Sequence, residues 1–197
     1  MSDVDTSYYK TPEWFKSLEW QRPWIEKMAG WWVGTYGKPK TVLDFGAGDG
    51  WWCKAFHDCG STCWAVELYE EAREFIPPQI YFIQHDLTEP VWLSSQADLV
   101  ICLEVAEHLP RPAGGVLVQT LCQHAANHIL FSSAGPGQEG TGHINLQPQK
   151  YWRDLFEGYK FGLNAGMTAQ ARQAFTWINK EVFQFLPPNI QIFSRLE

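Results

Sequence analysis

The strongest constraint in the sequence is a glycine-rich turn between an apolar run and a helical segment. Residues 42–50 read VLDFGAGDG, so that an acid-bearing apolar run is followed by three glycines at alternate positions. Glycine adopts backbone conformations that are costly for other residues, and it lets a ligand approach the backbone closely. Ligands of open α/β sheets bind at the carboxyl ends of strands. The turn is therefore a candidate ligand site, with a purely structural tight connection as the alternative.

Apolar runs and helical segments alternate after this point. The predicted strands are Thr41–Phe45, Thr62–Glu67, Ile80–Gln84, Ala97–Leu103 and His128–Ser132. The predicted helices between them are Trp51–Cys59, Glu70–Phe75 and Gly115–Ala126. The fourth run is apolar without alternation, which is typical of a strand covered on both faces. The pattern predicts an α/β fold with a Rossmann-like, doubly wound, mainly parallel sheet in a three-layer α/β/α arrangement.

The two ends of the chain differ from this middle part. Residues 1–40 are rich in tryptophan and are predicted to form a helical lid of the same domain, with simple packing as the alternative. One helix is predicted to begin at Pro12 behind the N-cap residue Thr11, and a second to cover Trp24–Trp32 after a break at Pro23. Residues 41–197 form the body of the domain.

The C-terminal part begins with a long loop. Residues 134–148 are rich in Gly, Pro and Gln, and loops of about 15 residues are usually functional or disordered. A helix is predicted over Gln149–Phe156. Two strands, Tyr159–Leu163 and Val182–Leu186, are predicted as an antiparallel pair joined by the helical stretch Met167–Phe175.

Composition excludes some classes of function. The net charge of −7 and the pI near 5.3 make nucleic acid an unfavourable partner, since proteins that bind its phosphates usually carry a basic patch. No apolar run approaches the roughly 20 residues that span a bilayer, so no membrane partner is expected. The polar N-terminus is unlike a signal peptide, and we expect a cytoplasmic location. Five cysteines without a CxxC pair predict buried, reduced thiols.

The acids around the turn indicate the charge of the ligand. A dinucleotide site of the form G-x-G-x-x-G would need glycine where Trp51 stands, and a pyrophosphate gains nothing from a carboxylate such as Asp44. Asp44 and Asp49 suit a ligand that carries positive charge. S-adenosylmethionine has an ammonium and a sulfonium group and no phosphate.

The stretch VLDFGAGDG resembles motif I of the class I S-adenosylmethionine-dependent methyltransferases, in particular their small-molecule, type 11/23-like members. Three further stretches follow in the order of that family: WAVE at 64–67, QHDL at 84–87 and DLVICLEVAEHL at 98–109, which is similar to a motif written EVxEHL. The resemblance is close over residues 41–135 and looser beyond them. It implies an enzyme that uses S-adenosylmethionine and releases S-adenosylhomocysteine.

The resemblance also implies a set of cofactor-binding residues. Glu67 would hold the ribose hydroxyls and Asp86 the adenine amino group. The full implied set is Asp44, Gly46, Ala47, Gly48, Glu67, Leu68, Asp86, Leu87, Leu103, Glu104 and His108. The alternatives are a solvated carboxylate for Glu67, a turn cap for Asp86, and a capped helix with a surface histidine for Glu104 and His108. E-x-x-E-H is not the zinc motif H-E-x-x-H, and we assign no metal.

Methyl transfer from a sulfonium needs little beyond alignment of the acceptor with the methyl group, and such positioning contributes roughly 7–11 kcal/mol. His143, in the long loop, is a candidate base and Asn145 a candidate for orienting the acceptor; the alternative is that both hold the loop. Of Trp51 and Trp52, one is expected to pack on the sheet and the other to cover the cofactor.

The sequence thus predicts a methyltransferase that acts on O or N of an unidentified small molecule. One alternative is a protein that binds the cofactor without transferase activity. Another is a protein or nucleic-acid methyltransferase, although residues 103–106 read LEVA and not the Asn-Pro-Pro-aromatic tetrad of base amino-methylation. The sequence leaves the acceptor and the oligomeric state open.

Overall fold

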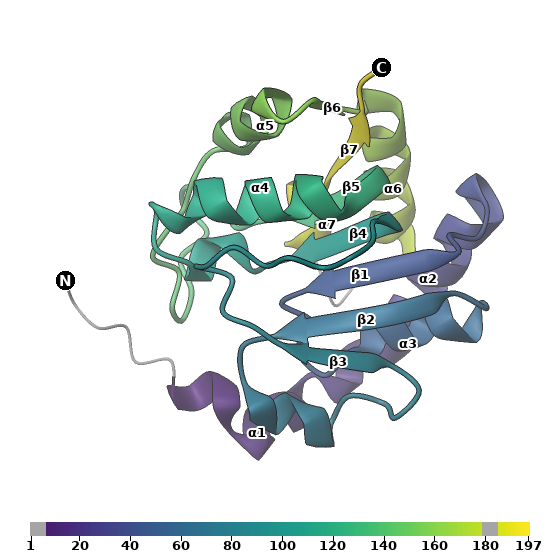
Figure 1. Ribbon diagram of the computed structural model, residues 1–197, viewed down its shortest axis with the longest axis vertical. Helices are drawn as coiled ribbons and strands as arrows, with labels where there is room; N and C mark the ends of the chain where they lie inside the picture. The colour runs from purple at the N-terminus through teal and green to yellow at the C-terminus, as the bar shows by residue number, and fades with distance from the viewer. Residues whose placement is uncertain (1–6, 179–184) are drawn as a thin grey trace.

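The computed structural model describes residues 7–178 and 185–197. These residues are arranged around a seven-stranded sheet (Figure 1). The strand order is β3-β2-β1-β4-β5-β7-β6. The strands are β1 (Thr41–Phe45), β2 (Thr62–Glu67), β3 (Tyr81–Gln84), β4 (Ala97–Leu103), β5 (Ala125–Ser132), β6 (Phe161–Leu163) and β7 (Gln191–Arg195). The strands β1 to β5 are parallel to one another, and β7 is antiparallel to both β5 and β6. This confirms the predicted fold class.

Helices cover both faces of the sheet. The α-helices are α1 (Pro12–Ser17), α2 (Arg22–Tyr36), α3 (Trp51–Asp58), α4 (Ala113–His124), α5 (Gln149–Gly158), α6 (Ala165–Ile178) and α7 (Leu186–Asn189). Four 3-10 helices are η1 (Ser7–Lys10), η2 (Glu19–Gln21), η3 (Glu70–Glu74) and η4 (Ala106–His108). In Figure 1, α4 and α5 lie on one face of the sheet, and α2, α3 and α6 lie on the other.

The strand order places a ligand crevice between β1 and β4. From β1 the chain proceeds to β2 and β3 on one side of the sheet, and it returns to β4 on the other side of β1. Connections therefore leave the carboxyl ends of β1 and β4 in opposite directions. Ligands of doubly wound sheets bind at such a switch point. The register that pairs Val42 with Leu99 and Asp44 with Ile101 brings the ends of both strands to this edge.

Large aromatic side chains fill the layer between the sheet and helices α4 and α5. Phe156 of α5 stacks on Phe193 of β7 with ring centroids 3.9 Å apart, and Phe131 of β5 meets both rings. Trp152 completes this group, and all four side chains are fully buried or nearly so. These contacts attach the antiparallel C-terminal strands to the parallel part of the sheet.

Most predicted elements are confirmed, several of them to the residue. β1, β2 and β4 have the predicted bounds, and β6 and β7 form an antiparallel pair. The predicted N-cap is present, since Thr11 Oγ1 accepts a hydrogen bond from the Trp14 N–H at 3.2 Å. Pro23 lies in the first turn of α2. All five cysteines are free, and Cys59 alone is not fully buried.

The prediction of the last strand is wrong. Of Val182–Leu186, residues 182–184 lie outside the described part of the chain, and Leu186 begins α7. Pro187 and Pro188 explain the helical turn, because proline lacks the N–H that a strand ladder needs and fits the first turn of a helix. The strand that pairs with β5 and β6 is Gln191–Arg195. No helix in the described residues is long and apolar enough to cross a membrane.

We expect Phe193→Ala to lower the free energy of unfolding by about 3–5 kcal/mol, because it removes the ring that stacks on Phe156 and leaves a cavity. Trp92→Ala is the control, since the Trp92 side chain is 74% exposed and its loss should cost about 0.5 kcal/mol or less. Urea denaturation of both variants measures the difference. Equal losses would contradict the packing role of Phe193.

Candidate functional site

The glycine turn after β1 has the backbone that its sequence predicts. Gly46, Gly48 and Gly50 all have positive φ, at 79°, 57° and 71°. A Cβ on Gly46 would lie 2.4 Å from a methyl group of Val105, which leaves no room for a side chain. The Gly46 N–H donates to the Val66 carbonyl at 2.8 Å, so the turn is fixed to β2. The result is a tight turn, fixed to β2, at the switch point of the sheet.

Glu67, the last residue of β2, braces this turn. Its Oε2 accepts a hydrogen bond from the Gly48 N–H at 3.0 Å, and its Oε1 accepts one from the Leu68 N–H at 2.7 Å. Burial raises the pKa of the Glu67 carboxyl, and these hydrogen bonds oppose the rise. The carboxylate is thus held by backbone donors at the crevice, and a carboxylate oxygen accepts more than one hydrogen bond.

The two acids of the turn have different electrostatic environments. Asp49 is neutralised, since its Oδ2 accepts hydrogen bonds from Arg22 Nε and Nη2 at 3.2 and 3.1 Å. Asp44 is 3% exposed, and its Oδ2 has no hydrogen-bond partner. Burial, followed by the negative charges of Glu67 and Asp49, raises the pKa of Asp44 to about 8. Among the residues that the structure describes, no cationic side chain pairs with this buried acid.

The two tryptophans that open α3 pack in different places. The guanidinium of Arg22 lies 4.2 Å from the centre of the Trp51 ring, so Trp51 supports the arginine that pairs with Asp49. Trp52 lies towards α6, with its ring 6.3 Å from that of Phe175. Trp51 is therefore the member of the pair that lies beside the turn.

Asp86 is exposed and caps a turn. Its Oδ1 accepts hydrogen bonds from the Thr88 N–H at 2.9 Å and from the Thr88 hydroxyl at 2.8 Å. This is the structural alternative that the sequence offered for Asp86. The neighbouring Leu87 is buried. The adenine contact of Asp86 stays a prediction.

The end of β4 carries strained backbone. Glu104 has φ = 53°, which is rare for a residue with a side chain, and such strain concentrates at functional sites. Its N–H donates to the Ser132 carbonyl at 3.2 Å and hydroxyl at 3.0 Å, which holds the strained residue against β5. Burial and the charge of Glu107 raise the pKa of Glu104 to about 8. Asn189 of α7 donates to Glu104 Oε1 at 3.3 Å.

Glu107 anchors the long loop, although the sequence analysis did not assign it to the site. The side chain is fully buried, and Oε1 accepts a hydrogen bond from the Ala134 N–H at 3.1 Å. The Glu107 carbonyl accepts hydrogen bonds from the N–H groups of Ile144 and Asn145 at 2.9 and 3.0 Å. Glu107 therefore fixes both ends of the loop. In the sequence, Glu107 could have been found as the second acid of the motif EVAEHL at residues 104–109.

The loop brings His143 onto His108. The two rings meet edge to face with centroids 4.9 Å apart. Nδ1 of His143 lies 2.7 Å from the Gln138 carbonyl, and a carbonyl can only accept, so Nδ1 carries the proton and Nε2 has a free lone pair. Burial and the neighbouring His143 lower the pKa of His108 to about 4, which keeps its imidazole neutral.

Asn145 is fixed by the chain itself. It is 1% exposed, its Nδ2 donates to the Ala106 carbonyl at 3.1 Å, and its Oδ1 accepts a hydrogen bond from Gln147 at 3.0 Å. Both ends of the amide are thus engaged. The geometry favours the loop-holding interpretation over a role in orienting an acceptor.

The N-terminal segment lies over both halves of the site. The position of a Cβ on Gly48 is 3.2 Å from Leu18 Cδ1 and 3.7 Å from the Trp14 ring. The Tyr9 hydroxyl donates to the Thr141 carbonyl at 2.5 Å, and the Tyr9 ring meets His108 with centroids 5.3 Å apart. One segment therefore contacts the glycine turn and the long loop.

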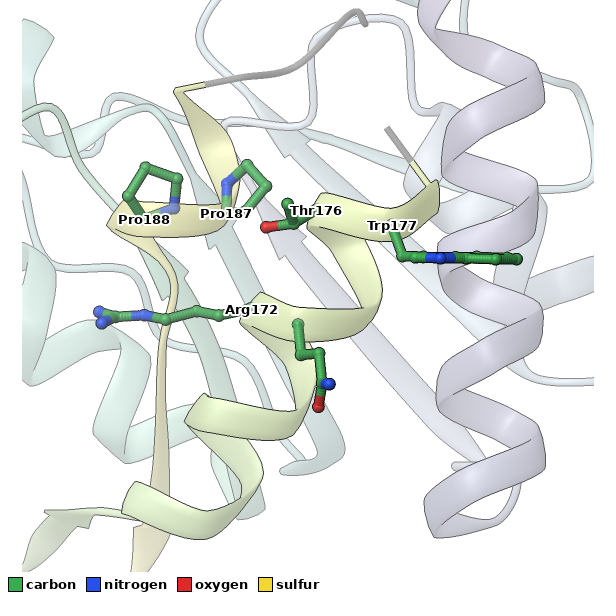
Figure 2. Close-up of a pocket in the computed structure, with 6 residues that line it drawn as sticks. Arg172, Thr176, Trp177, Pro187 and Pro188 are labelled. Carbon is green, nitrogen blue, oxygen red and sulfur yellow. The ribbon is translucent and has the colours of Figure 1, made fainter. Parts of the chain in front are cut away.

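A separate hollow lies between α6 and α7 (Figure 2). Its volume is about 440 Å³, and Figure 2 shows Arg172 and Trp177 extending from opposite sides of α6. It is lined by Arg172, Gln173, Thr176, Trp177, Pro187 and Pro188. No residue of the predicted cofactor set lines this hollow.

Comparison with known sequences gives the family. The sequence model described as a methyltransferase domain matches residues 19–165, which is more than half of the chain. This chain belongs to the methyltransferase-domain family. It is an S-adenosylmethionine-dependent methyltransferase of class I, as the motifs indicated. No curated protein sequence matches it significantly.

Solved structures share the fold at low sequence identity. The magnesium protoporphyrin IX methyltransferase of Synechocystis, with bound S-adenosylhomocysteine, has a TM-score of 0.63 at 17% identity over 90% of this chain and 84% of that one. The 1,6-didemethyltoxoflavin-N1-methyltransferase of Burkholderia thailandensis has a TM-score of 0.62 at 14% identity over 92% and 82%. A putative methyltransferase of Haloferax volcanii, in complex with the activator Trm112, has a TM-score of 0.70 at 12% identity over the whole of both chains.

We expect Asp44→Asn to flatten the pH dependence of stability. The folded pKa of about 8 lies above the ordinary value of 3.8, so the protonated form stabilises the fold at low pH. That contribution is lost as the pH rises from about 4 to about 8, at roughly 1.4 kcal/mol per pH unit.

Urea denaturation between pH 4 and 8 compares the two proteins without ligand. Between pH 4 and pH 8, the free energy of unfolding of the variant relative to that of wild type should rise by a few kcal/mol. The nearby Cys53 and Cys102 thiols do not interfere, because burial raises their pKa values as well. A stability difference that is independent of pH would contradict the uncompensated charge of Asp44.

Proposed function

We propose that this methyltransferase transfers the methyl group of S-adenosylmethionine to an oxygen or nitrogen atom of a small-molecule acceptor. The observation that carries the proposal is the pair of buried acids near the carboxyl ends of β1 and β2. There the Glu67 carboxylate is bonded to the Gly48 N–H, beside the buried and unbalanced acid Asp44. This arrangement suits a cationic ligand that also offers a diol.

The residues of the crevice fit the cofactor. A carboxylate accepts two hydrogen bonds from a ribose diol, and its charge strengthens both, which suits Glu67. The positive charge of the ligand would favour the ionised form of Asp44, whose Oδ2 is buried without a partner among the described residues. The bare peptide groups of Gly46, Ala47 and Gly48 allow close approach.

The remaining predicted contacts lie along the same edge of the sheet. Leu68 follows Glu67 and is 40% exposed, and Asp86 with Leu87 follows β3. We assign these residues to the adenosine half of the cofactor. Leu103, Glu104 and His108 follow β4, and we assign them to the side that faces the methyl group.

Catalysis would proceed by alignment and by exclusion of water. Bound S-adenosylmethionine supplies an electrophilic methyl group with a good leaving group, so the protein has chiefly to place the acceptor in line with it. We propose that the long loop, fixed by Glu107, forms the wall against which the acceptor lies. Residues 7–36, through Tyr9, Trp14 and Leu18, act as the lid that covers both groups.

The class of acceptor is supported by charge and by the structural neighbours. The net charge of −7 disfavours a nucleic-acid acceptor. Neighbours with the same fold include methyltransferases named for a porphyrin, a toxoflavin precursor and a sugar. Because these molecules differ widely in shape, we propose only that the acceptor is a small molecule.

The proposal is tested in two steps. Calorimetry should show micromolar binding of S-adenosylhomocysteine, and NADH should not compete. Incubation of the protein with methyl-labelled S-adenosylmethionine and fractionated metabolite extracts should then label a small molecule. Binding without any labelled product would favour a cofactor-binding protein, and label in protein or nucleic acid would contradict the acceptor class.

We expect Gly48→Val to abolish binding of S-adenosylhomocysteine, because its side chain would project towards Leu18 from the turn. Gly37→Val is the matched control. Gly37 also has a positive φ, of 87°, but a Cβ there meets nothing within 4 Å. Both variants bear backbone strain of about 1–2 kcal/mol, and only Gly48→Val should lose the ligand. Calorimetry at a temperature at which both variants are folded measures their affinities for S-adenosylhomocysteine. Equal affinities of the two variants would show that the turn lies outside the cofactor site.

We expect Glu67→Ala to weaken S-adenosylhomocysteine binding by at least tenfold, because a hydrogen bond to a charged group contributes about 1.5–3 kcal/mol. Glu67→Gln should recover part of the loss, since the amide keeps one acceptor for Gly48. Glu71→Ala, at an exposed position of η3, is the control. Titration calorimetry measures all three, and an unchanged dissociation constant for Glu67→Ala would remove Glu67 from the ribose site.

A further inference from the structure

Three potential metal ligands meet beside the predicted methyl-transfer site. A carboxylate oxygen of Glu107 and one ring nitrogen each of His108 and His143 all lie within 4.8 Å of one another. Glu107 and His108 belong to η4, and His143 comes from the long loop after β5. From the sequence we assigned no metal, because the spacing of E-x-x-E-H matches no zinc motif. The sequence also does not indicate that the loop brings His143 next to Glu107 and His108.

Glu107 and His143 each form a hydrogen bond through one side-chain atom and leave a second side-chain atom available to bind a cation. Glu107 Oε1 accepts a hydrogen bond from the Ala134 N–H, while its Oε2 is buried without a partner. His143 donates through Nδ1 to the Gln138 carbonyl, which leaves the lone pair of Nε2 free. Metal-bound histidines characteristically donate their other N–H to a carbonyl or carboxylate in this way.

His108 adds a second unpartnered atom. Its Nδ1 is buried and has no hydrogen bond. A buried polar atom without a partner is costly, so two of them on adjacent residues of one cluster indicate a ligand. Within the described part of the chain, neither Glu107 nor Glu104 forms an ion pair, so no cationic side chain occupies the place of a metal ion.

Two glycines of the loop keep this space free of side chains. A Cβ on Gly140 would lie 2.8 Å from Nε2 of His143. A Cβ on Gly142 would lie 3.1 Å from Nδ1 of His108, and Gly142 has φ = 71°. Any larger residue at either position would press on a nitrogen of the cluster.

We propose that Glu107, His108 and His143 form a binding site for one divalent transition-metal cation. Two imidazoles and one carboxylate suit zinc, iron, cobalt or nickel, whereas magnesium and calcium prefer oxygen ligands alone. Three protein ligands leave coordination positions open, as in catalytic metal sites.

The open positions suggest a use for the metal that rests on the proposed function. A cation at this place would bind an acceptor through oxygen and lower the pKa of a hydroxyl group, whose proton leaves to water. The oxygen lone pair then forms the new bond to the methyl carbon, and the electrons of the broken carbon–sulfur bond remain on sulfur. This favours a hydroxyl over an amine as the acceptor.

Metal binding is measured on the untagged, metal-stripped full chain. Titration with Co²⁺ should show one equivalent bound and visible absorption bands, and Zn²⁺ should displace it. His143→Ala, His108→Ala and Glu107→Gln should each weaken Co²⁺ binding by at least tenfold. His57→Ala is the control for adventitious binding by a histidine elsewhere and should leave the affinity unchanged.

A second variant guards against loss of folding. Gly140→Ala leaves all three ligands in the sequence but displaces the His143 ring, so it should also weaken Co²⁺ binding. Retained binding of S-adenosylhomocysteine by His143→Ala, Glu107→Gln and Gly140→Ala, none of which alters a residue of the predicted cofactor set, shows that the cofactor site is intact. Absence of stoichiometric binding, or binding that none of these variants alters, would overturn the metal site. A metal-loaded protein that methylates nothing would instead count against the proposed function alone.

Discussion

The carboxyl edge of the sheet is defined by buried negative charge. Asp44 is the last residue but one of β1, Glu67 ends β2, and Glu104 and Glu107 follow β4. Burial raises the pKa of all four carboxyls, so each ionises at a cost to the fold. Backbone N–H groups compensate Glu67 and one oxygen of Glu107. A cation from outside the chain would favour the ionised form of the remaining carboxyls, and the proposed sulfonium cofactor and metal ion would supply such cations at the two halves of the site.

Much of this fold could be predicted because its signals are local. Buried parallel strands are continuous apolar runs, and a strand–turn–helix connection at a ligand site needs glycine. Both signals lie within residues 41–50, and the positive φ values of Gly46 and Gly48 follow from them. The N-cap at Thr11 is equally local, since its hydrogen bond reaches only to Trp14.

The errors and omissions arise where distant segments decide the outcome. The stretch before Leu186 has the alternation of a strand, but the prolines after it make a helical turn, and pairing with β5 passes to Gln191–Arg195. His143 lies 35 residues beyond His108, and the hydrogen bonds of the Glu107 carbonyl to the loop are what bring them together. The spacing of residues along the sequence does not indicate a contact between residues so far apart.

The N-terminal segment links the two halves of the site mechanically. Leu18 and Trp14 contact the glycine turn, and Tyr9 contacts both Thr141 of the long loop and His108. A segment that contacts both halves cannot move from one without disturbing its contacts with the other, because η1 and α1 are joined by Thr11 alone. If the segment is the proposed lid, entry of a ligand at the turn would therefore also loosen the cover of the long loop, and closure over the turn would restore it. Water would then be excluded from the cofactor and from the acceptor in one event, which is the condition that an in-line transfer governed by positioning requires.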